Sequence, residues 1–233
     1  MRKIKFAPGE YYHLVNRGVG KKNIFINTAD YARFLFLILY CQSPVSFTNI
    51  GHHTSKFKNT NTFRISLTTE TKVISNRYVE LVSFCLMPNH FHLLIKEEQE
   101  GGISCYMQRI QNAYTKYFNT KNKITGHLFQ GPFRAVHIED NEQLLYLSAY
   151  IHKNCSELKG WRSKENTYPW SSLIAYNYNY HWSKLLKPEI ILEQFNNLDD
   201  YMNWLKNNSA KESLTDLSNQ LMDTECPLID GVD

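Results

Sequence analysis

The chain has 233 residues and a net charge of +4, and 42% of its residues are hydrophobic, which is enough for one large domain with a proper core. The longest apolar run, residues 34–41, is far too short to cross a bilayer, and no apolar segment of a signal peptide follows the basic N-terminus. The five cysteines are dispersed without a C-x-x-C pair, which favours reduced thiols in a cytoplasmic protein over a disulfide framework or a zinc knuckle.

The first third of the chain predicts a strand and a helix followed by a long polar connection. The strand and helix patterns cover residues 10–16 and 31–40. Thr28 or Asp30 can cap the helix. Residues 43–76 are polar and rich in Thr and Asn, so they predict an insertion or long loop, with one strand fragment at 63–68 that allows a hairpin.

The rest of the chain predicts a hairpin, a strand and several helices. Residues 78–86 and 90–97 are rich in apolar and β-branched residues, and the dipeptide Pro88-Asn89 breaks them as a turn does. The elements that follow are a helix over 103–118, a strand over 133–139, a helix over 142–153 with Asp140 or Asn141 as its cap, and a short helix over 170–178. Residues 188–218 predict two polar amphipathic helices before a frayed acidic tail.

This order of strands and helices indicates an α+β fold. The economical architecture is an antiparallel sheet with helices packed on one face, close to a ferredoxin-like split βαβ arrangement. We expect one domain over residues 1–180, with 43–76 as its insertion or long loop, and a helical C-terminal extension over 181–233.

Two histidines in the predicted hairpin point to a metal site. His90 and His92 lie two residues apart on a strand, so their side chains project from the same face. Two neutral imidazoles on a rigid strand can make half of a divalent metal site. An isolated H-x-H pair also occurs by chance, as packed histidines or as ligands of a structural zinc.

The helix predicted over 142–153 can complete such a site. Tyr150 and Asn154 are four residues apart, which places them on one helical face with their Cβ atoms about 6 Å apart. An amide oxygen there can bind a metal while the phenol stands one turn away. A phenol with a pKa of about 10 is a poor nucleophile without the help of a cation or a base, and a divalent ion can also polarise a phosphodiester. The alternatives are a core aromatic residue for Tyr150 and a helix C-cap for Asn154.

A basic segment lies between these two parts of the candidate site. Residues 101–138 contain no acidic residue, and aromatic side chains alternate with cations, as suits a phosphate backbone with bases to stack on. An ordinary solvated basic face explains the same pattern equally well. The cations of this segment are Arg109, Lys116, Lys121, Lys123 and Arg134.

Five ordered stretches resemble the single-tyrosine HUH transposases, especially the REP-associated tyrosine transposases. They are residues 12–18, 87–94, 126–133, 150–154 and 168–172. Residues 87–94, Met-Pro-Asn-His-Phe-His-Leu-Leu, hold the His-hydrophobic-His motif that gives the group its name. The similarity extends over roughly residues 6–178, and the family usually has a proline where Cys155 stands.

The resemblance implies a catalytic site of two metal-binding histidines, an amide as third ligand and a tyrosine nucleophile: His90, His92, Asn154 and Tyr150. The implied metal is Mg²⁺ or Mn²⁺. The implied substrate is single-stranded DNA with hairpins (REP-like or element ends), cut and rejoined through a 5′-phosphotyrosine. The protein is then a DNA endonuclease and strand transferase of the cytoplasm, a monomer or a homodimer. Arg17 and His127 lie in matching stretches and join the five cations above as candidate DNA contacts.

Two other functions remain open. A domesticated, non-catalytic DNA- or RNA-binding protein would keep the fold, although it has no need for an intact set of catalytic residues. A structural-zinc interaction module lacks the cysteine spacing that such a site requires.

Overall fold

A single antiparallel sheet lies at the centre of the computed structural model, which describes residues 4–178 and 180–208. Its strands are β1 (Tyr11–Arg17), β2 (Val79–Met87), β3 (His90–Glu97) and β4 (Arg134–His137). They lie in the order β2-β3-β1-β4, with every pair antiparallel. Helical segments connect β1 to β2 and β3 to β4, so this is a ferredoxin-like arrangement. The predicted α+β class is therefore confirmed.

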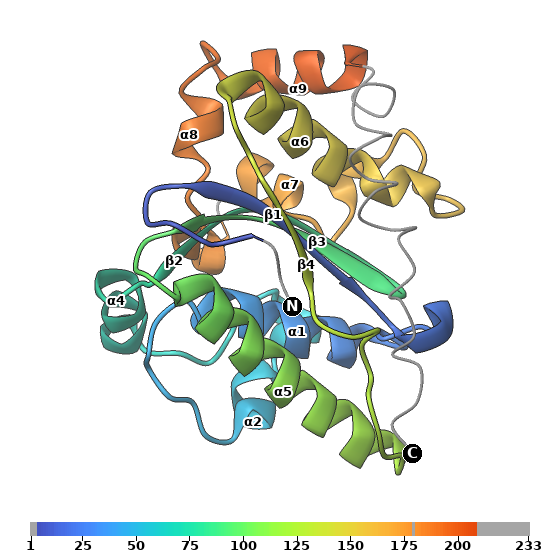
Figure 1. The fold of residues 1–233 in the computed structure, drawn as a ribbon. Helices are drawn as coiled ribbons and strands as arrows, with labels where there is room; N and C mark the ends of the chain where they lie inside the picture. Colours follow the sequence, from blue (N-terminus) through green and yellow to red (C-terminus); the bar gives the residue numbers. More distant parts are fainter. Residues whose placement is uncertain (1–3, 179, 209–233) are drawn as a thin grey trace, which may run out of the picture.

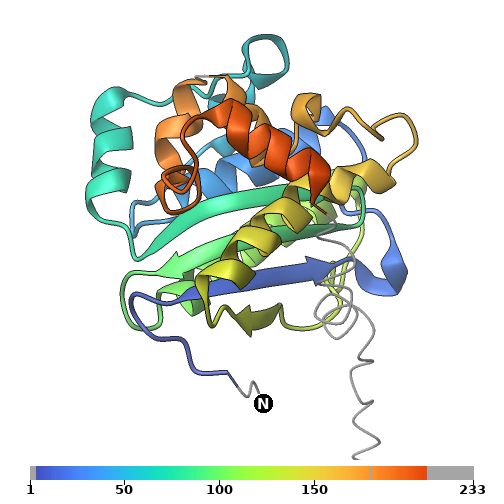
Figure 2. The ribbon, with the colours of Figure 1, turned by 90° about the horizontal axis from the view of Figure 1, so that it is seen from above.

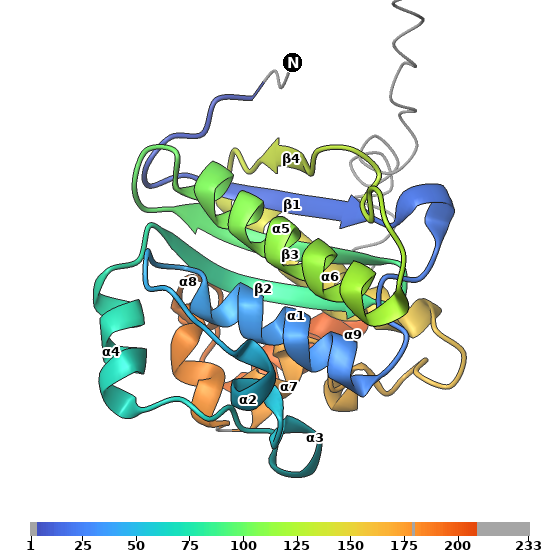
Figure 3. The same ribbon diagram turned by 90° about the horizontal axis from the view of Figure 1, so that it is seen from below.

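One face of the sheet is covered by α1 (Thr28–Tyr40) and α5 (Gly102–Asn122), as Figures 1 and 3 show. Helix α1 is apolar around its whole circumference, and every residue from Phe34 to Tyr40 is buried. Such a helix is stable only when it is enclosed on several sides, here by the sheet, α5 and the segment that follows α1. Each large side chain buried there contributes roughly 1.5–3 kcal/mol.

The other face is covered by α6 (Asn141–Lys153) together with the C-terminal helices α7 (Ser172–Asn177), α8 (Glu189–Leu192) and α9 (Leu198–Asn207). Figure 2 shows α6 lying over the sheet with α9 beside it. Tyr201 and Leu205 of α9 are buried in the same apolar cluster as Leu147 of α6. Helices thus pack on both faces, and the predicted C-terminal extension forms part of the core that holds α6 in place. The acidic tail and the end of the predicted 188–218 region, from residue 209, lie outside the described residues.

The polar connection over 43–76 is helical, which corrects the expectation of a loop with a strand fragment. It contains α2 (Ile50–Thr54), α3 (Phe57–Thr60) and α4 (Leu67–Ser75). The predicted strand 63–68 does not form, because Ser66 caps α4 by accepting a hydrogen bond from the Thr69 amide. Phe63 stacks on Phe57 at 4.6 Å between ring centroids, and this local contact replaces a strand partner.

Several element ends differ from the predicted ones by a few residues. Helix α1 is capped by Asn27, and Asp30, a predicted cap, is the third residue of the resulting capping box. Helix α5 continues to Asn122, and α7 begins only after the cap at Ser171. The short 3-10 helices are η1 (Val19–Lys21), η2 (Asn154–Glu157), η3 (Glu165–Thr167) and η4 (His181–Leu185). Among the described residues no helix combines the length and apolarity needed to span a membrane.

Candidate active site

Strand β3 and helix α6 bring together the four residues that the sequence singles out. His90 and His92 project from β3 towards α6, with their ring centroids 5.0 Å apart. Asn154 Oδ1 lies 3.3 Å from His90 Nε2, and the Tyr150 ring lies 5.4 Å from the His92 ring, edge to face. Residues about sixty positions apart in sequence therefore form one buried site.

The periodicity of α6 explains why these two side chains face the sheet. Leu147, Tyr150, Ile151 and Asn154 follow the three- and four-residue spacing of one helical face, and all four are buried. The helix continues directly into η2 after Lys153, with Cys155 buried, and Asn154 lies beside His90.

The environment of His90 fixes which of its nitrogens carries the proton. The Asn89 amide donates to the Lys21 carbonyl at 3.1 Å, which turns Asn89 Oδ1 towards His90 Nδ1 at 2.6 Å. Because that oxygen can only accept, Nδ1 is the donor and Nε2 keeps its lone pair. Nε2 then faces Asn154 Oδ1, which is also an acceptor. Two acceptors that face one another favour a cation between them.

His92 offers a second unused lone-pair position. Its Nε2 is buried and has no hydrogen-bond partner within the described part of the chain. Burial lowers the pKa of His90 to about 4, and burial also lowers the pKa of His92 well below its ordinary value. Both rings are therefore neutral near pH 7, which is the form that binds metal ions.

The donor set fits a divalent cation. His90 Nε2, His92 Nε2 and Asn154 Oδ1 provide two imidazole nitrogens and one amide oxygen. Within residues 4–178 and 180–208, no three or more His, Cys, Asp or Glu side chains are grouped so that they can hold a metal. The third donor of the candidate set is the amide oxygen of Asn154.

Sequence reasoning missed a third histidine at this site. His13 of β1 is buried, and its Nε2 lies 2.9 Å from His92 Nδ1. The contact depends on the pairing of Val15 with His92 between β1 and β3, which places His13 diagonally across from His92. The signals in the sequence were a histidine within a largely apolar strand and its place in residues 12–18, one of the stretches that carry the resemblance.

Two of the predicted DNA contacts lie beside the histidines. Arg17 pairs with His90 across β1 and β3, and Arg134 of β4 pairs with Val15, the partner of His92. Directly opposed residues of neighbouring strands point to the same face, so both arginines share the face of the site. Both are half-buried, and Arg17 Nε donates to Gln130 Oε1 at 2.7 Å.

The other predicted cations are placed away from the histidines. Lys116, Lys123 and His127 are exposed on α5 and on the loop after it. Arg109 donates to the backbone carbonyls of Ser43 and Val45 and to the Tyr78 hydroxyl, so its guanidinium holds the chain after α1. Lys121 forms an ion pair with the buried carboxylate of Asp30. These partners give Arg109 and Lys121 structural roles.

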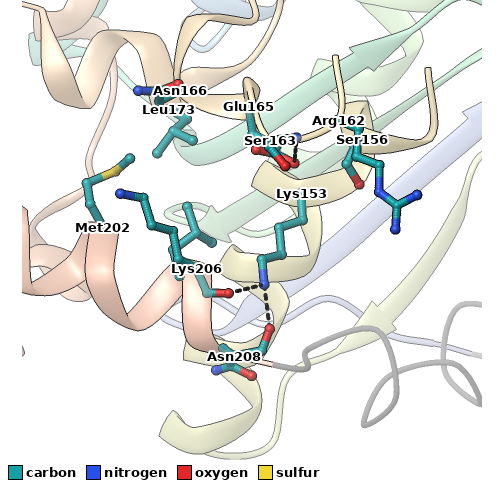
Figure 4. A pocket seen from close by; sticks show the side chains of 11 residues that line it. Lys153, Ser156, Arg162, Ser163, Glu165, Asn166, Leu173, Met202, Lys206 and Asn208 are labelled. Carbon is teal, nitrogen blue, oxygen red and sulfur yellow. Dashed lines mark hydrogen bonds between the residues drawn. The ribbon is translucent and has the colours of Figure 1, made fainter. Parts of the chain in front are cut away.

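A cavity of about 700 Å³ lies between the end of α6, the segment around Arg162 and α9 (Figure 4). Lys153 enters it and donates to the carbonyls of Lys206 and Asn208. None of the four candidate site residues lines this cavity. The reactive groups therefore lie on the side of α6 that faces the sheet.

Residues 57–154 match the model of a protein family described as IS200-like transposases. The chain resembles these transposases, as its motifs indicate. The matched transposase segment is somewhat less than half of the chain, and it ends at Asn154. In addition to Asn154, the matched segment contains His90, His92 and Tyr150, whereas His13 and Arg17 lie before it.

One similar solved structure is that of a REP-associated tyrosine transposase bound to a REP hairpin. The two share 13% sequence identity with a TM-score of 0.47, over 74% of this chain and 81% of that one. Among curated proteins, none matches the sequence.

Proposed function

We propose that this protein is a metal-dependent DNA transposase that nicks and rejoins single-stranded, hairpin-containing DNA through Tyr150. The observation that carries the proposal is the meeting of Tyr150 and Asn154 with His90 and His92. All four lie within the segment that matches IS200-like transposases. A buried cluster of unpaired lone pairs next to a tyrosine costs stability, and chemistry at that position explains why it is present.

Mg²⁺ or Mn²⁺ would be held by His90 Nε2, His92 Nε2 and Asn154 Oδ1. When bound, the ion would polarise a phosphodiester oxygen and stabilise the negative charge that develops on it. Asn89 supports this site by keeping the proton of His90 on Nδ1. The neutral state of both histidines leaves their lone pairs available for the ion.

Tyr150 acts as the nucleophile. Its hydroxyl oxygen bonds to the phosphorus as the bond from phosphorus to the 3′ oxygen breaks. The phenol loses its proton, and the departing 3′ oxygen gains one. The 5′ side of the DNA stays attached as a phosphotyrosine, whose bond energy lets a 3′-hydroxyl rejoin the strand without a nucleotide cofactor.

The DNA backbone runs over the arginines beside the site. Arg17 and Arg134 lie on the face of the histidines and are placed to contact phosphates next to the reacting one. Lys116, Lys123 and His127 are exposed on α5 and on the loop after it, away from the histidines, and contact phosphates farther along the DNA. All the proposed catalytic residues come from one chain, and the protein acts as a monomer or a homodimer.

The test is a covalent adduct between the protein and labelled, hairpin-bearing single-stranded DNA in the presence of Mn²⁺. We expect the adduct in the wild type and its loss in Tyr150→Phe. Tyr146→Phe is the matched control, because Tyr146 lies one turn earlier on α6 and contacts Trp204. Adduct formation that persists in Tyr150→Phe contradicts the assignment. A wild type that binds the DNA but never forms an adduct supports the non-catalytic binding protein.

A further inference from the structure

His13 is a buried residue that the proposed reaction does not use. It is 1% exposed, and its ring stacks on that of His92 with centroids 5.1 Å apart and planes 19° apart. Its Nε2 and His92 Nδ1 are 2.9 Å apart, and the Nδ1 of His13 has no partner within the described residues. The two rings are therefore each other's hydrogen-bond partner at these nitrogens.

A hydrogen bond between two neutral imidazoles can be arranged in two ways. If His13 donates, His92 accepts on Nδ1 and carries its own proton on Nε2, which leaves no lone pair for a metal. If His92 donates from Nδ1, its Nε2 is free to bind a cation. Only the second arrangement is compatible with a metal at His92 Nε2, and it requires an acceptor at the position of His13 Nε2.

We propose that His13 is a positioning residue that accepts the Nδ1 proton of His92 and so presents the His92 Nε2 lone pair to the metal. The inference rests on the proposed metal site. His13 then does for His92 what Asn89 does for His90, where the Nδ1 proton is accepted by an amide oxygen at 2.6 Å. Partners of this kind set the tautomer and orientation of metal-binding histidines.

The removal of the acceptor leaves a buried N–H without a partner whenever metal is bound. We expect His13→Leu to raise the Mn²⁺ dissociation constant about 10- to 100-fold, the usual effect of losing such a partner. His13→Gln keeps an acceptor on a side chain of similar reach, so its dissociation constant should stay within about threefold of the wild type.

The experiment is a Mn²⁺ titration of the full chain followed by electron paramagnetic resonance, which counts free Mn²⁺ and needs no DNA. His152→Leu is the matched control, because His152 is also a buried histidine, bonded to Tyr201 and Ser172 at 2.7 Å each. It should lower the melting temperature with little change in Mn²⁺ affinity. This control separates loss of positioning from general loosening of the fold.

The outcomes separate the inference from the proposed function. A folded His13→Leu variant with wild-type Mn²⁺ affinity overturns the inference and leaves the metal site intact. Equal weakening in His13→Gln and His13→Leu also overturns it, because the acceptor would then be irrelevant. A wild type that binds no Mn²⁺ overturns the proposed function, and the role of His13 with it.

Discussion

The two faces of the sheet use buried polar groups in different ways. On the face of α1 and α5, these groups secure the fold: Tyr106 donates to the Ile38 carbonyl and Tyr114 to the Ile24 carbonyl, at 2.6 Å each. On the face of α6, four histidines of the described residues are buried: His13, His90, His92 and His152. The first three surround the candidate site. The first face is built for stability, and the second gives up stability to hold neutral imidazoles.

Lowering the pH should reveal this difference between the two faces, and its effect on the free energy of unfolding should be the largest of the predicted effects. Burial lowers the pKa of His13 and His152 to about 3 and that of His90 to about 4, and it lowers the pKa of His92 as well. The unfolded chain therefore binds more protons than the folded one below an ordinary histidine pKa of about 6.5. Stability that is complete above that pH is lost as the pH falls towards 4.

The expected loss is large, at about 1.4 kcal/mol for each pH unit and each histidine that must stay neutral. Between pH 6.5 and 4.5 the four histidines together can lose on the order of 10 kcal/mol, which is comparable to the roughly 5–15 kcal/mol that stabilises a typical domain. Urea unfolding between pH 7 and pH 4.5 measures the loss, and hydrogen exchange should show α6 losing protection before α1. A protein equally stable at both pH values contradicts the idea that these rings are buried neutral.

Phe34→Ala tests the face of the sheet that α1 and α5 cover. Phe34 is fully buried and packs on Phe91 and Tyr114, with centroids 4.9 and 5.0 Å away. The substitution should cost about 3–5 kcal/mol of unfolding free energy, because the cavity it leaves in a packed aromatic cluster cannot close fully. Chemical denaturation measures this cost. The Mn²⁺ affinity of the molecules that stay folded should change by no more than about threefold, since Phe34 lies across the sheet from the site.

His90→Ala tests the other face and should give the opposite result. It removes one of three proposed ligands, so we expect Mn²⁺ affinity to fall by at least about 100-fold. Stability at neutral pH should change less than in Phe34→Ala, because the ring contacts polar partners, Asn89, Asn154 and the His92 ring, where Phe34 packs in an aromatic cluster. Its acid sensitivity should also decrease, since one neutral ring is gone. Unchanged Mn²⁺ binding would place the metal elsewhere.

The elements of both faces could largely be predicted from the sequence, because their signals are local. The Pro88-Asn89 turn, the two histidines of β3 and the Asp140 cap of α6 are all placed as their patterns indicate. The spacing of Tyr150 and Asn154 also predicted their shared face. These features depend on contacts within a few residues.

The long-range features could not be predicted in this way. The contact of His13 with His92 depends on the register between β1 and β3, which a single sequence does not specify. Arg109 has the pattern of a DNA contact, yet carbonyls more than sixty residues earlier in the chain take its hydrogen bonds. Nor does the polarity of residues 43–76 reveal that their few aromatic residues pack on α1.

The smallest expected effects separate DNA contacts from structural cations on the same helix, α5. Lys116 is exposed, whereas Lys121 pairs with the buried Asp30 carboxylate. Lys116→Ala should leave stability unchanged and reduce the slope of log affinity for single-stranded DNA against log salt by about 0.7, the loss of one phosphate contact. Lys121→Ala should keep that slope and cost about 1 kcal/mol of stability, because Asp30 retains the Tyr117 hydroxyl and two backbone amides as donors.

Fluorescence anisotropy at several salt concentrations measures the slope, and urea unfolding measures the stability. The reverse outcome, with Lys121 changing the slope and Lys116 the stability, would mean that the Lys121–Asp30 ion pair opens to bind DNA.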